Sequence, residues 1–121
     1  MILGLRTVIY PVADLTKGKA WYNQLTGTTP YFDQPFYVGY AVGGFELGLI
    51  PDGVPGPDGA IAYWGVADID ADVARMQKMG ATVKEAVKDV GDGIKVASLA
   101  DPFGNLVGLI ENPHFKLADV R

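Results

Sequence analysis

Glu46 is the residue whose type and setting most suggest chemistry, because it is the one charged residue in the apolar run Phe45–Ile50. A carboxyl group buried among apolar side chains has a raised pKa, and it can then act as a general base or pair with a cationic group of a ligand. The alternative is a solvated carboxylate, or one paired with Arg6 or a lysine. The sequence leaves both interpretations open.

The other reactive side chains suggest little further chemistry. The chain has no cysteine, which excludes a disulfide framework, a thiol nucleophile and a thiolate metal site. The single histidine, His114, follows the last apolar run, so we expect it on the surface and not at a metal. Ser98 has no histidine to activate it as a nucleophile. We expect instead that its hydroxyl is hydrogen-bonded within a strand. No nucleophile elbow, phosphate loop or dinucleotide fingerprint occurs.

A predicted β-hairpin positions Glu46. Gly43-Gly44 joins the runs Phe36–Val42 and Phe45–Ile50 and is typical of a two-residue turn with positive φ angles. Such a turn predicts the cross-strand pairs Val42 with Phe45, Ala41 with Glu46, and Gly39 with Gly48. Alternation then gives a core face of Val38, Tyr40, Val42, Phe45, Leu47 and Leu49. The other face carries Tyr37, Gly39, Ala41, Glu46, Gly48 and Ile50.

Glycines on this second face admit two interpretations. Gly39 and Gly48, with Gly65 and Gly108 elsewhere, remove side chains and would leave space for a ligand. Alternatively, they only let the strands bend. By the same spacing argument we expect Trp21, Trp64, Phe45 and Tyr40 in the core.

A second hairpin lies near the end of the chain. Asp101-Pro102-Phe103-Gly104-Asn105 is a tight-turn sequence, in which Pro102 presets φ while Gly104 and Asn105 tolerate positive φ. It connects Ile94–Ala100 with the apolar run Leu106–Ile110, which predicts a buried strand.

The chain repeats one pattern of elements. Val12-Ala13-Asp14-Leu15 and Val66-Ala67-Asp68-Ile69 each end a strand and place an aspartate at a helix N-cap. The helices are expected over Leu15–Leu25 and from Asp68 through Met79, and Gly27 and Gly80 end them. The apolar stripe of the first is Ala20, Trp21 and Leu25, with Tyr22 at its border. The remaining strands are expected over Leu3–Val12, Pro30–Phe32, Ile61–Val66 and near Val83. The order is βαβββ twice, an α+β fold with an internal repeat.

Length and composition indicate one globular domain of 121 residues. We expect module one over 1–51, a Pro/Gly-rich linker over 52–59, module two over 60–111 and a C-terminal tail over 112–121. The net charge of −4 argues against a nucleic-acid partner and suits a cationic small molecule or merely a soluble surface. No apolar run reaches the roughly 18 residues of a membrane span, and no signal peptide opens the chain, so a cytoplasmic location is expected.

Four motifs carry a resemblance to a known family: Thr7–Leu15, the pair Trp21-Tyr22, the second Val66–Ile69, and Asp101–Asn105. Together they span nearly the whole chain. They resemble the vicinal oxygen chelate superfamily of glyoxalase I, extradiol dioxygenases, fosfomycin resistance enzymes and bleomycin resistance proteins. The resemblance implies a cup of curved mixed sheets, one metal held by both modules, and a homodimer.

The metal positions that the resemblance implies are largely unsuited to a metal in this sequence. They correspond to Thr7, Glu46, Ile61 and Gly108, where metal-binding members carry His, Gln or Glu. One carboxylate and one hydroxyl do not make the three or four donors that a divalent ion needs. We therefore expect no metal and no other cofactor, and glyoxalase-type chemistry would lack its Lewis acid.

Three functions follow as hypotheses. The first is a metal-independent protein of the bleomycin resistance type that binds a flat or amphipathic organic molecule in the cup. The alternative is a lyase or isomerase of the glyoxalase type with Glu46 as general base, and the third is a scaffold that only dimerises. The candidate ligand-binding residues are Thr7, Ile9, Tyr37, Gly39, Glu46, Gly48, Ile61, Tyr63, Ser98, Leu106 and Gly108, with Ile110 adding apolar wall.

Overall fold

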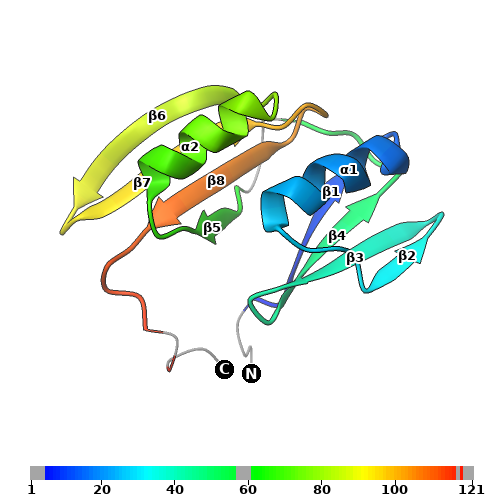
Figure 1. Ribbon diagram of the computed structural model, residues 1–121, viewed down its shortest axis with the longest axis horizontal. Helices are drawn as coiled ribbons and strands as arrows, with labels where there is room; N and C mark the ends of the chain where they lie inside the picture. The colour runs from blue at the N-terminus through cyan, green and yellow to red at the C-terminus, as the bar shows by residue number, and fades with distance from the viewer. Residues whose placement is uncertain (1–4, 57–60, 117, 119–121) are drawn as a thin grey trace. The chain divides into compact units, whose positions relative to one another are not determined.

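The computed structural model describes residues 5–56, 61–116 and 118 of the chain (Figure 1). It divides into two compact units, which we call unit 1 (Met1–Pro55) and unit 2 (Gly56–Arg121). Within the described residues, each unit has one α-helix and one four-stranded sheet.

Unit 1 begins with β1 (Thr7–Pro11) and α1 (Leu15–Thr26) and continues with β2 (Phe32–Gln34), β3 (Tyr37–Val42) and β4 (Phe45–Ile50). The strand order in its sheet is β1-β4-β3-β2. β1 runs parallel to β4, while β4 and β3, and β3 and β2, are antiparallel. The last strand therefore lies in the middle of the sheet, between β1 and β3.

Unit 2 has the same topology with β5 (Tyr63–Gly65), α2 (Ile69–Lys78), β6 (Thr82–Gly91), β7 (Ile94–Ala100) and β8 (Leu106–Glu111). The strand order is β5-β8-β7-β6, with β5 parallel to β8. The predicted repeat of two βαβββ modules is confirmed.

Both helices begin where the sequence predicts, and each ends within one residue of its predicted end. The Asp14 side chain accepts a hydrogen bond from Lys17 N (3.1 Å), and that of Asp68 accepts one from Ala71 N (3.1 Å). Such bonds satisfy backbone donors that the first turn of a helix leaves free. Gly27 follows α1 with a φ of 71° in the left-handed region, which a glycine adopts without strain.

The first hairpin has the predicted register. Gly43 and Gly44 have φ angles of 57° and 87°, as a primed turn requires at both positions. The pairs are Val42 with Phe45, Ala41 with Glu46, and Gly39 with Gly48. Val38, Tyr40, Leu47 and Leu49 are fully buried on the face that α1 covers, whereas Val42 and Phe45 are half-buried.

Asp101 holds the second hairpin turn together through hydrogen bonds. Its Oδ1 accepts from the backbone nitrogens of Phe103 (2.9 Å) and Asn105 (2.8 Å), and its Oδ2 accepts from Asn105 Nδ2 (3.2 Å). Asp101 and Asn105 are both buried. Gly104 has a positive φ of 95°, whereas Asn105 does not. Of the two residues expected to tolerate a positive φ, only the glycine therefore adopts one.

The predicted apolar stripe of α1 is partly wrong. Ala20 is exposed, and the helix meets the sheet through Gly18, Trp21 and Tyr22, with Leu25 half-buried. These positions follow the i, i+3, i+4, i+7 spacing of one helix face. A Cβ at Gly18 would lie 2.8 Å from Val12 Cγ2, so the absent side chain lets the helix approach the sheet closely.

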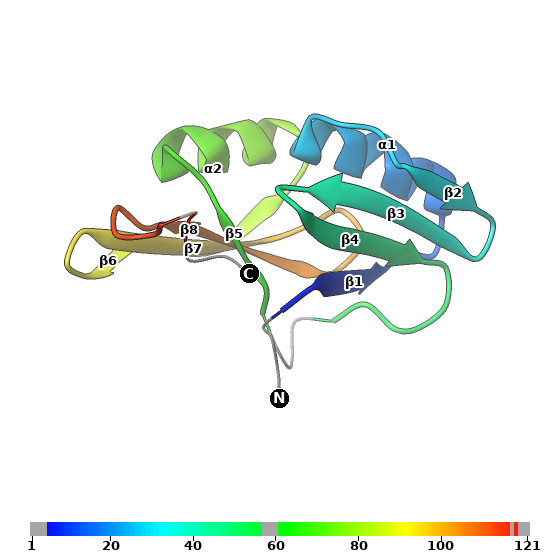
Figure 2. The ribbon, with the colours of Figure 1, turned by 90° about the horizontal axis from the view of Figure 1, so that it is seen from below.

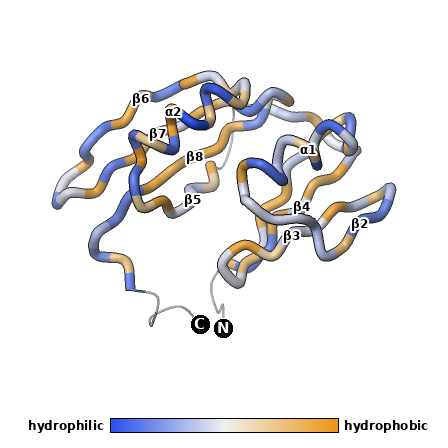
Figure 3. The backbone as a smooth tube through the Cα atoms, viewed as in Figure 1, coloured by the Kyte–Doolittle hydropathy of each residue, from blue (hydrophilic) through white to orange (hydrophobic). Residues whose placement is uncertain are grey.

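The core of unit 2 lies between α2 and its sheet. Seen edge-on in Figure 2, α2 forms a layer on one side of β6, β7 and β8. Figure 3 shows that β8 is mostly hydrophobic, while hydrophilic and hydrophobic residues alternate along β6. The buried apolar residues are Ile69, Met76, Ala81, Ala97, Leu99, Val107 and Leu109.

Several strand boundaries differ from the predictions. Within the described residues the first strand begins at Thr7, and Leu3 lies outside them. β5 is shorter than Ile61–Val66, and β2 lies two residues later than Pro30–Phe32 because Pro30 has no N–H to donate. β6 is longer than a short strand near Val83, because it pairs with the whole of β7 and three irregularities in register add residues to it. The linker residues 57–60 lie outside the described part. Neither described helix is long and apolar enough to cross a membrane.

Candidate ligand-binding face

The six candidate residues of unit 1 gather on one face of its sheet. Residues directly opposite each other on neighbouring strands share a face, and the pairing joins Thr7 to Glu46 and Ile9 to Gly48. Gly48 in turn pairs with Gly39, and Gly39 with Phe32 of β2. We call this side, opposite α1, the open face of unit 1. It carries Thr7, Ile9, Phe32, Tyr37, Gly39, Glu46 and Gly48.

Two tyrosine hydroxyls hold the Glu46 carboxylate on the open face. Tyr31, which precedes β2, donates to Oε1, and Tyr37 of β3 donates to Oε2. Tyr31 N also donates to Gly39 O (3.0 Å), which fixes the backbone of Tyr31 beside β3. Each carboxylate oxygen thus has its own phenol donor.

These hydrogen bonds set the charge of the cluster. The bonds from Tyr31 and from Tyr37 lower the pKa of Glu46, and they outweigh the raising effect of burial. Burial and the bond to Glu46 raise the pKa of Tyr37 to about 12, and the bond to Glu46 raises that of Tyr31. Of the two interpretations left open by the sequence, the one in which burial raises the Glu46 pKa is therefore wrong. Glu46 is ionised and both phenols are protonated at neutral pH.

The glycines of the open face seat aromatic rings and leave no empty volume. A Cβ at Gly48 would lie 2.7 Å from Tyr37 Cζ and 2.8 Å from its Cε2. A Cβ at Gly39 would lie 3.1 Å from Tyr37 Cε1 and 3.4 Å from Tyr31 Cε1. Gly39 and Gly48 thus let both rings lie flat on the sheet, and the expectation that they leave space for a ligand is corrected.

The aromatic side chains that neighbour Tyr37, the donor to Glu46, remain exposed, as does the second donor Tyr31. The exposed fractions are 65% for Tyr31, 65% for Phe36 and 38% for Phe32, and Ile9 on the same face is 50% exposed. Phe32 lies edge-on to Phe36 and to Tyr37, with ring centroids 6.1 Å apart in each pair. The open face therefore presents an ionised carboxylate within an apolar, aromatic surface.

The five candidates of unit 2 occupy the equivalent face of the second sheet. Gly108 of β8 pairs with Tyr63 of β5 and with Ser98 of β7. The Tyr63 ring covers Gly108, whose Cβ would lie 2.7 Å from Tyr63 Cδ1. Ser98 is buried and Tyr63 is 47% exposed. Ile61, which precedes β5, and Leu106 are half-buried, as is Ile110.

The repeat shows that a glycine occupies the same strand position in both units. Gly48 pairs with Ile9 and Gly39, and Gly108 pairs with Tyr63 and Ser98 on the corresponding strands. Glu46 consequently corresponds to Leu106. The repeat counterpart of Gly108 is thus Gly48, which lies two residues after Glu46. The resemblance had implied metal-ligand positions at Glu46 and at Gly108.

The side chains present do not fit a bound metal. No group of three or more His, Cys, Asp or Glu residues that could hold an ion occurs within residues 5–56, 61–116 and 118. The donors at the implied positions are one carboxylate, already bonded by two phenols, and the Thr7 hydroxyl. A divalent ion needs more oxygen or nitrogen ligands than these.

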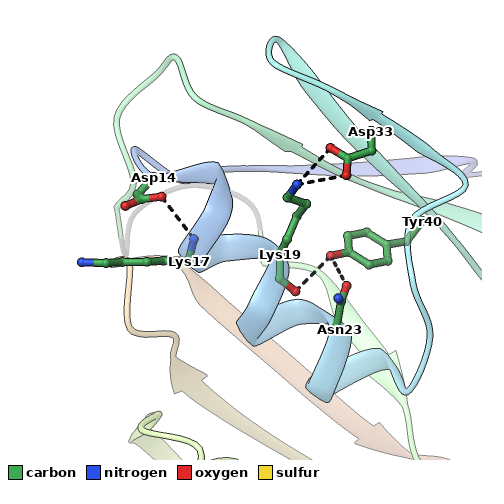
Figure 4. Close-up of polar contacts among 6 residues, drawn as sticks. All are labelled: Asp14, Lys17, Lys19, Asn23, Asp33 and Tyr40. Carbon is green, nitrogen blue, oxygen red and sulfur yellow. Dashed lines mark hydrogen bonds and ion pairs between the residues drawn. The ribbon is translucent and has the colours of Figure 1, made fainter.

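A separate hollow of about 340 Å³ lies between α1 and β2, lined by Leu15, Thr16, Lys19, Asp33, Gln34 and Pro35. Lys19 Nζ pairs with Asp33 there at 2.9 Å (Figure 4). Beside it, Tyr40 Oη donates to Asn23 Oδ1 at 2.7 Å, and burial raises the pKa of Tyr40 to about 12. These contacts tie α1 to the strands. None of the predicted site residues lines this hollow.

Tyr31, Phe32 and Phe36 are parts of the candidate site that sequence reasoning missed. They lie with Tyr37 in the segment 31–37, which holds four aromatic residues among seven. Such a cluster just before a hairpin was the available signal. His114 was assigned correctly to the surface: it is exposed, and its Nε2 lies 2.8 Å from Asp92 O.

Comparison with known proteins identifies the fold and the family. The sequence model described as the Glyoxalase/Bleomycin resistance protein/Dioxygenase superfamily matches residues 4–109. A structure of lactoylglutathione lyase from Agrobacterium tumefaciens has a TM-score of 0.77 at 18% identity, covering 96% of this chain and 100% of that one. TioX from Micromonospora sp. ML1 has a TM-score of 0.71 at 18% identity, with 89% and 98% covered.

A glyoxalase-related enzyme from Fulvimarina pelagi is similar as well, with a TM-score of 0.75, 18% identity and coverage of 93% and 90%. At such identities the likeness establishes the fold and no activity. No curated protein matches the sequence.

Proposed function

This chain belongs to the Glyoxalase/Bleomycin resistance protein/Dioxygenase superfamily, and from that membership we propose that it binds a small organic molecule without a metal ion. The open face of unit 1 is the binding surface, Glu46 is its polar anchor, and Tyr31 and Tyr37 flank the anchor. The observation that carries the proposal is the pair of tyrosine hydroxyls donating to one carboxylate on an exposed aromatic surface.

The hydrogen bonds favour a binding role over general-base catalysis. A general base works best with a pKa near the operating pH. The pKa of Glu46 is lowered by its phenol donors, so its carboxylate is a weak proton acceptor. The lyase or isomerase hypothesis thus loses the raised pKa on which it depended, and the drug-sequestering type of function is the one that we propose.

The aromatic rings would supply much of the affinity. Each ring that packs against a flat ligand contributes about 0.5–1.5 kcal/mol beyond the burial of its area. Tyr37 is already held in place by Gly48 and Glu46, so little rotational entropy would be lost when a ligand binds. The charged anchor would orient the ligand more than it tightens binding.

A thermal-shift screen tests the proposal. Metabolites and glycopeptide or quinone antibiotics are screened against the wild type, Glu46→Gln and the matched control Glu85→Gln, an exposed position of unit 2. We expect hits that Glu46→Gln or Tyr37→Ala weakens and Glu85→Gln does not. Hits unaffected by Glu46→Gln and Tyr37→Ala would show that the open face of unit 1 is not the site. Tyr63→Ala tests separately whether the equivalent face of unit 2 binds the ligand.

We also propose that the protein is a homodimer, as the family resemblance implies, and that it lies in the cytoplasm. Exposed apolar side chains outside the open face, such as Val90 and Phe115, provide surface that a second copy could bury. Sedimentation equilibrium at micromolar concentrations measures the mass directly. A purely monomeric species there would contradict the dimer while leaving the binding proposal intact.

A further inference from the structure

The cluster of Tyr31, Glu46 and Tyr37 has the charge and the aromatic surroundings of a site for an organic cation. We propose that it recognises an ammonium group bearing apolar substituents, presented by the small molecule that binds the open face of unit 1. This inference rests on the proposed function and specifies the chemical class of its ligand.

The negative charge of the cluster is retained because its hydrogen-bond donors are neutral. Phenol hydroxyls stabilise the ionised carboxylate of Glu46 without cancelling its charge. The ion pairs within the described residues are Lys19 with Asp33 and Arg75 with Asp72, so neither involves Glu46. Arg6 instead donates to the Leu5 carbonyl oxygen (3.2 Å). The open face therefore carries a full negative charge beside its rings.

The rings around this charge suit a cation with apolar substituents. Aromatic faces attract a cation through their quadrupole, and the attraction grows as water is excluded. Tyr31 and Phe36 are each 65% exposed, and Phe32 and Tyr37 lie edge-on to one another beside them. Ile9, half exposed on the same face, adds an aliphatic contact for the substituents. A hydrated metal ion would gain nothing from such apolar neighbours.

Neutral and anionic ligands are disfavoured by the same arrangement. A neutral molecule that covers the cluster removes water from the Glu46 carboxylate without supplying a counter-charge. An anion is repelled by the carboxylate directly. If the inference holds, the open face therefore distinguishes a cation from a neutral molecule of the same shape. Binding through apolar contacts alone would not distinguish them.

Two molecules of equal shape and different charge test it. The full chain, labelled with ¹⁵N, is titrated by NMR with meta-hydroxyphenyl-trimethylammonium and with meta-tert-butylphenol, in which a quaternary carbon replaces the nitrogen. The titrations are repeated on Glu46→Gln, on Tyr37→Phe and on the control Glu85→Gln. Circular dichroism and thermal unfolding establish that each variant is folded. Tyr37→Phe removes a hydroxyl and keeps the aromatic ring, whereas Glu46→Gln removes the negative charge.

We expect the cation to bind about tenfold more tightly than its neutral counterpart, with shifts at β3, β4 and the segment before β2. Glu46→Gln should reduce this preference to about twofold or less, while Glu85→Gln leaves it unchanged. Equal binding of both molecules on the open face would overturn the cation inference and leave the proposed function standing. A preference that persists in Glu46→Gln, or shifts confined to other surfaces, would also overturn it.

Discussion

At the scale of single residues, the protonation state of Glu46 decides what the open face can do. A carboxylate alone in an apolar strand would be a base with a raised pKa. The phenols of Tyr31 and Tyr37 reverse that outcome, because each donates to one oxygen of the ionised form. The same hydrogen bonds raise the pKa of both tyrosines, so that their hydroxyls stay protonated at neutral pH. Glu46 is thereby a charged carboxylate and a weak acceptor of protons, as its proposed role as an anchor requires.

Gly48→Ala should displace the Tyr37 ring, which lies over Gly48. The added methyl group would lie 2.7 Å from Tyr37 Cζ, so the ring must move and its bond to Glu46 is lost. We expect the free energy of unfolding to fall by about 1–3 kcal/mol, as in other overpacked sites, and the Glu46 pKa to rise. Urea denaturation measures the free energy of unfolding, and ¹³C NMR of the side-chain carboxyl group measures the Glu46 pKa.

Gly65→Ala is the matched control, since no atom lies within 4 Å of a Cβ at that strand glycine. Its effect on stability should be small. Equal losses in the two variants would show that Tyr37 is not seated on Gly48 as described.

Acidification should destabilise the protein partly through Glu46. Because the pKa of Glu46 is lower in the folded state, its contribution to stability is complete above the unfolded value of about 4.3 and disappears as the pH falls through the folded value. The double variant Tyr31→Phe, Tyr37→Phe lacks both donors and should lose less stability on acidification than the wild type. Urea denaturation at neutral and at acid pH measures this, with Tyr63→Phe as control. Identical acid sensitivity in all three proteins would contradict the hydrogen bonds.

The sequence predicted the side of the sheet on which Glu46 lies, but not its partners. The Gly43-Gly44 turn fixes the register, and alternation then places Tyr37, Glu46 and Gly48 together. The hydrogen bonds could not be predicted, since Tyr31 comes from outside any strand and depends on where β2 begins. For the same reason Gly39 and Gly48 were expected to border empty space, whereas the Tyr37 and Tyr31 rings fill it.

At the scale of elements, the turn at Asp101 should be the most sensitive connection. Asp101→Ala removes an acceptor used by the backbone of Phe103 and of Asn105 in a buried position. We expect a loss of about 2–4 kcal/mol in the free energy of unfolding, because buried donors remain unpaired. Asp52→Ala, at an exposed position, is the control and should change stability little. A loss below about 0.5 kcal/mol for Asp101→Ala would contradict this role of the turn.

Element types were more predictable than their ends. Asp caps and terminal glycines mark both helices because they satisfy backbone groups that any helix leaves free. The ends of β5 and β6 depend instead on pairing with β8 and β7, which local sequence does not encode. The buried face of α1 differs from the predicted one for a similar reason, since Gly18 packs against Leu49 of β4 as well as against the nearby Val12.

At the scale of the whole molecule, the same arrangement of strands and helix occurs in both units, and the described residues of neither unit supply a set of metal ligands. Gly48 and Gly108 occupy equivalent positions on the central strands, each beneath a tyrosine ring. We expect elemental analysis of the purified protein to find no stoichiometric zinc, nickel or iron. A stoichiometric metal that survives mild purification would contradict this and the assignment of Thr7, Ile61 and Gly108 to ligand positions.

The charge state of Glu46 is the central claim, and NMR titration of its side-chain carboxyl carbon in the full chain measures it most directly. The resonance is assigned by its loss in Glu46→Gln and followed from neutral pH into the acid range. We predict a midpoint below the ordinary glutamate pKa of about 4.3, moving upward in Tyr37→Phe. A midpoint well above the ordinary value, unmoved by Tyr37→Phe, would contradict the account and restore Glu46 as a candidate base.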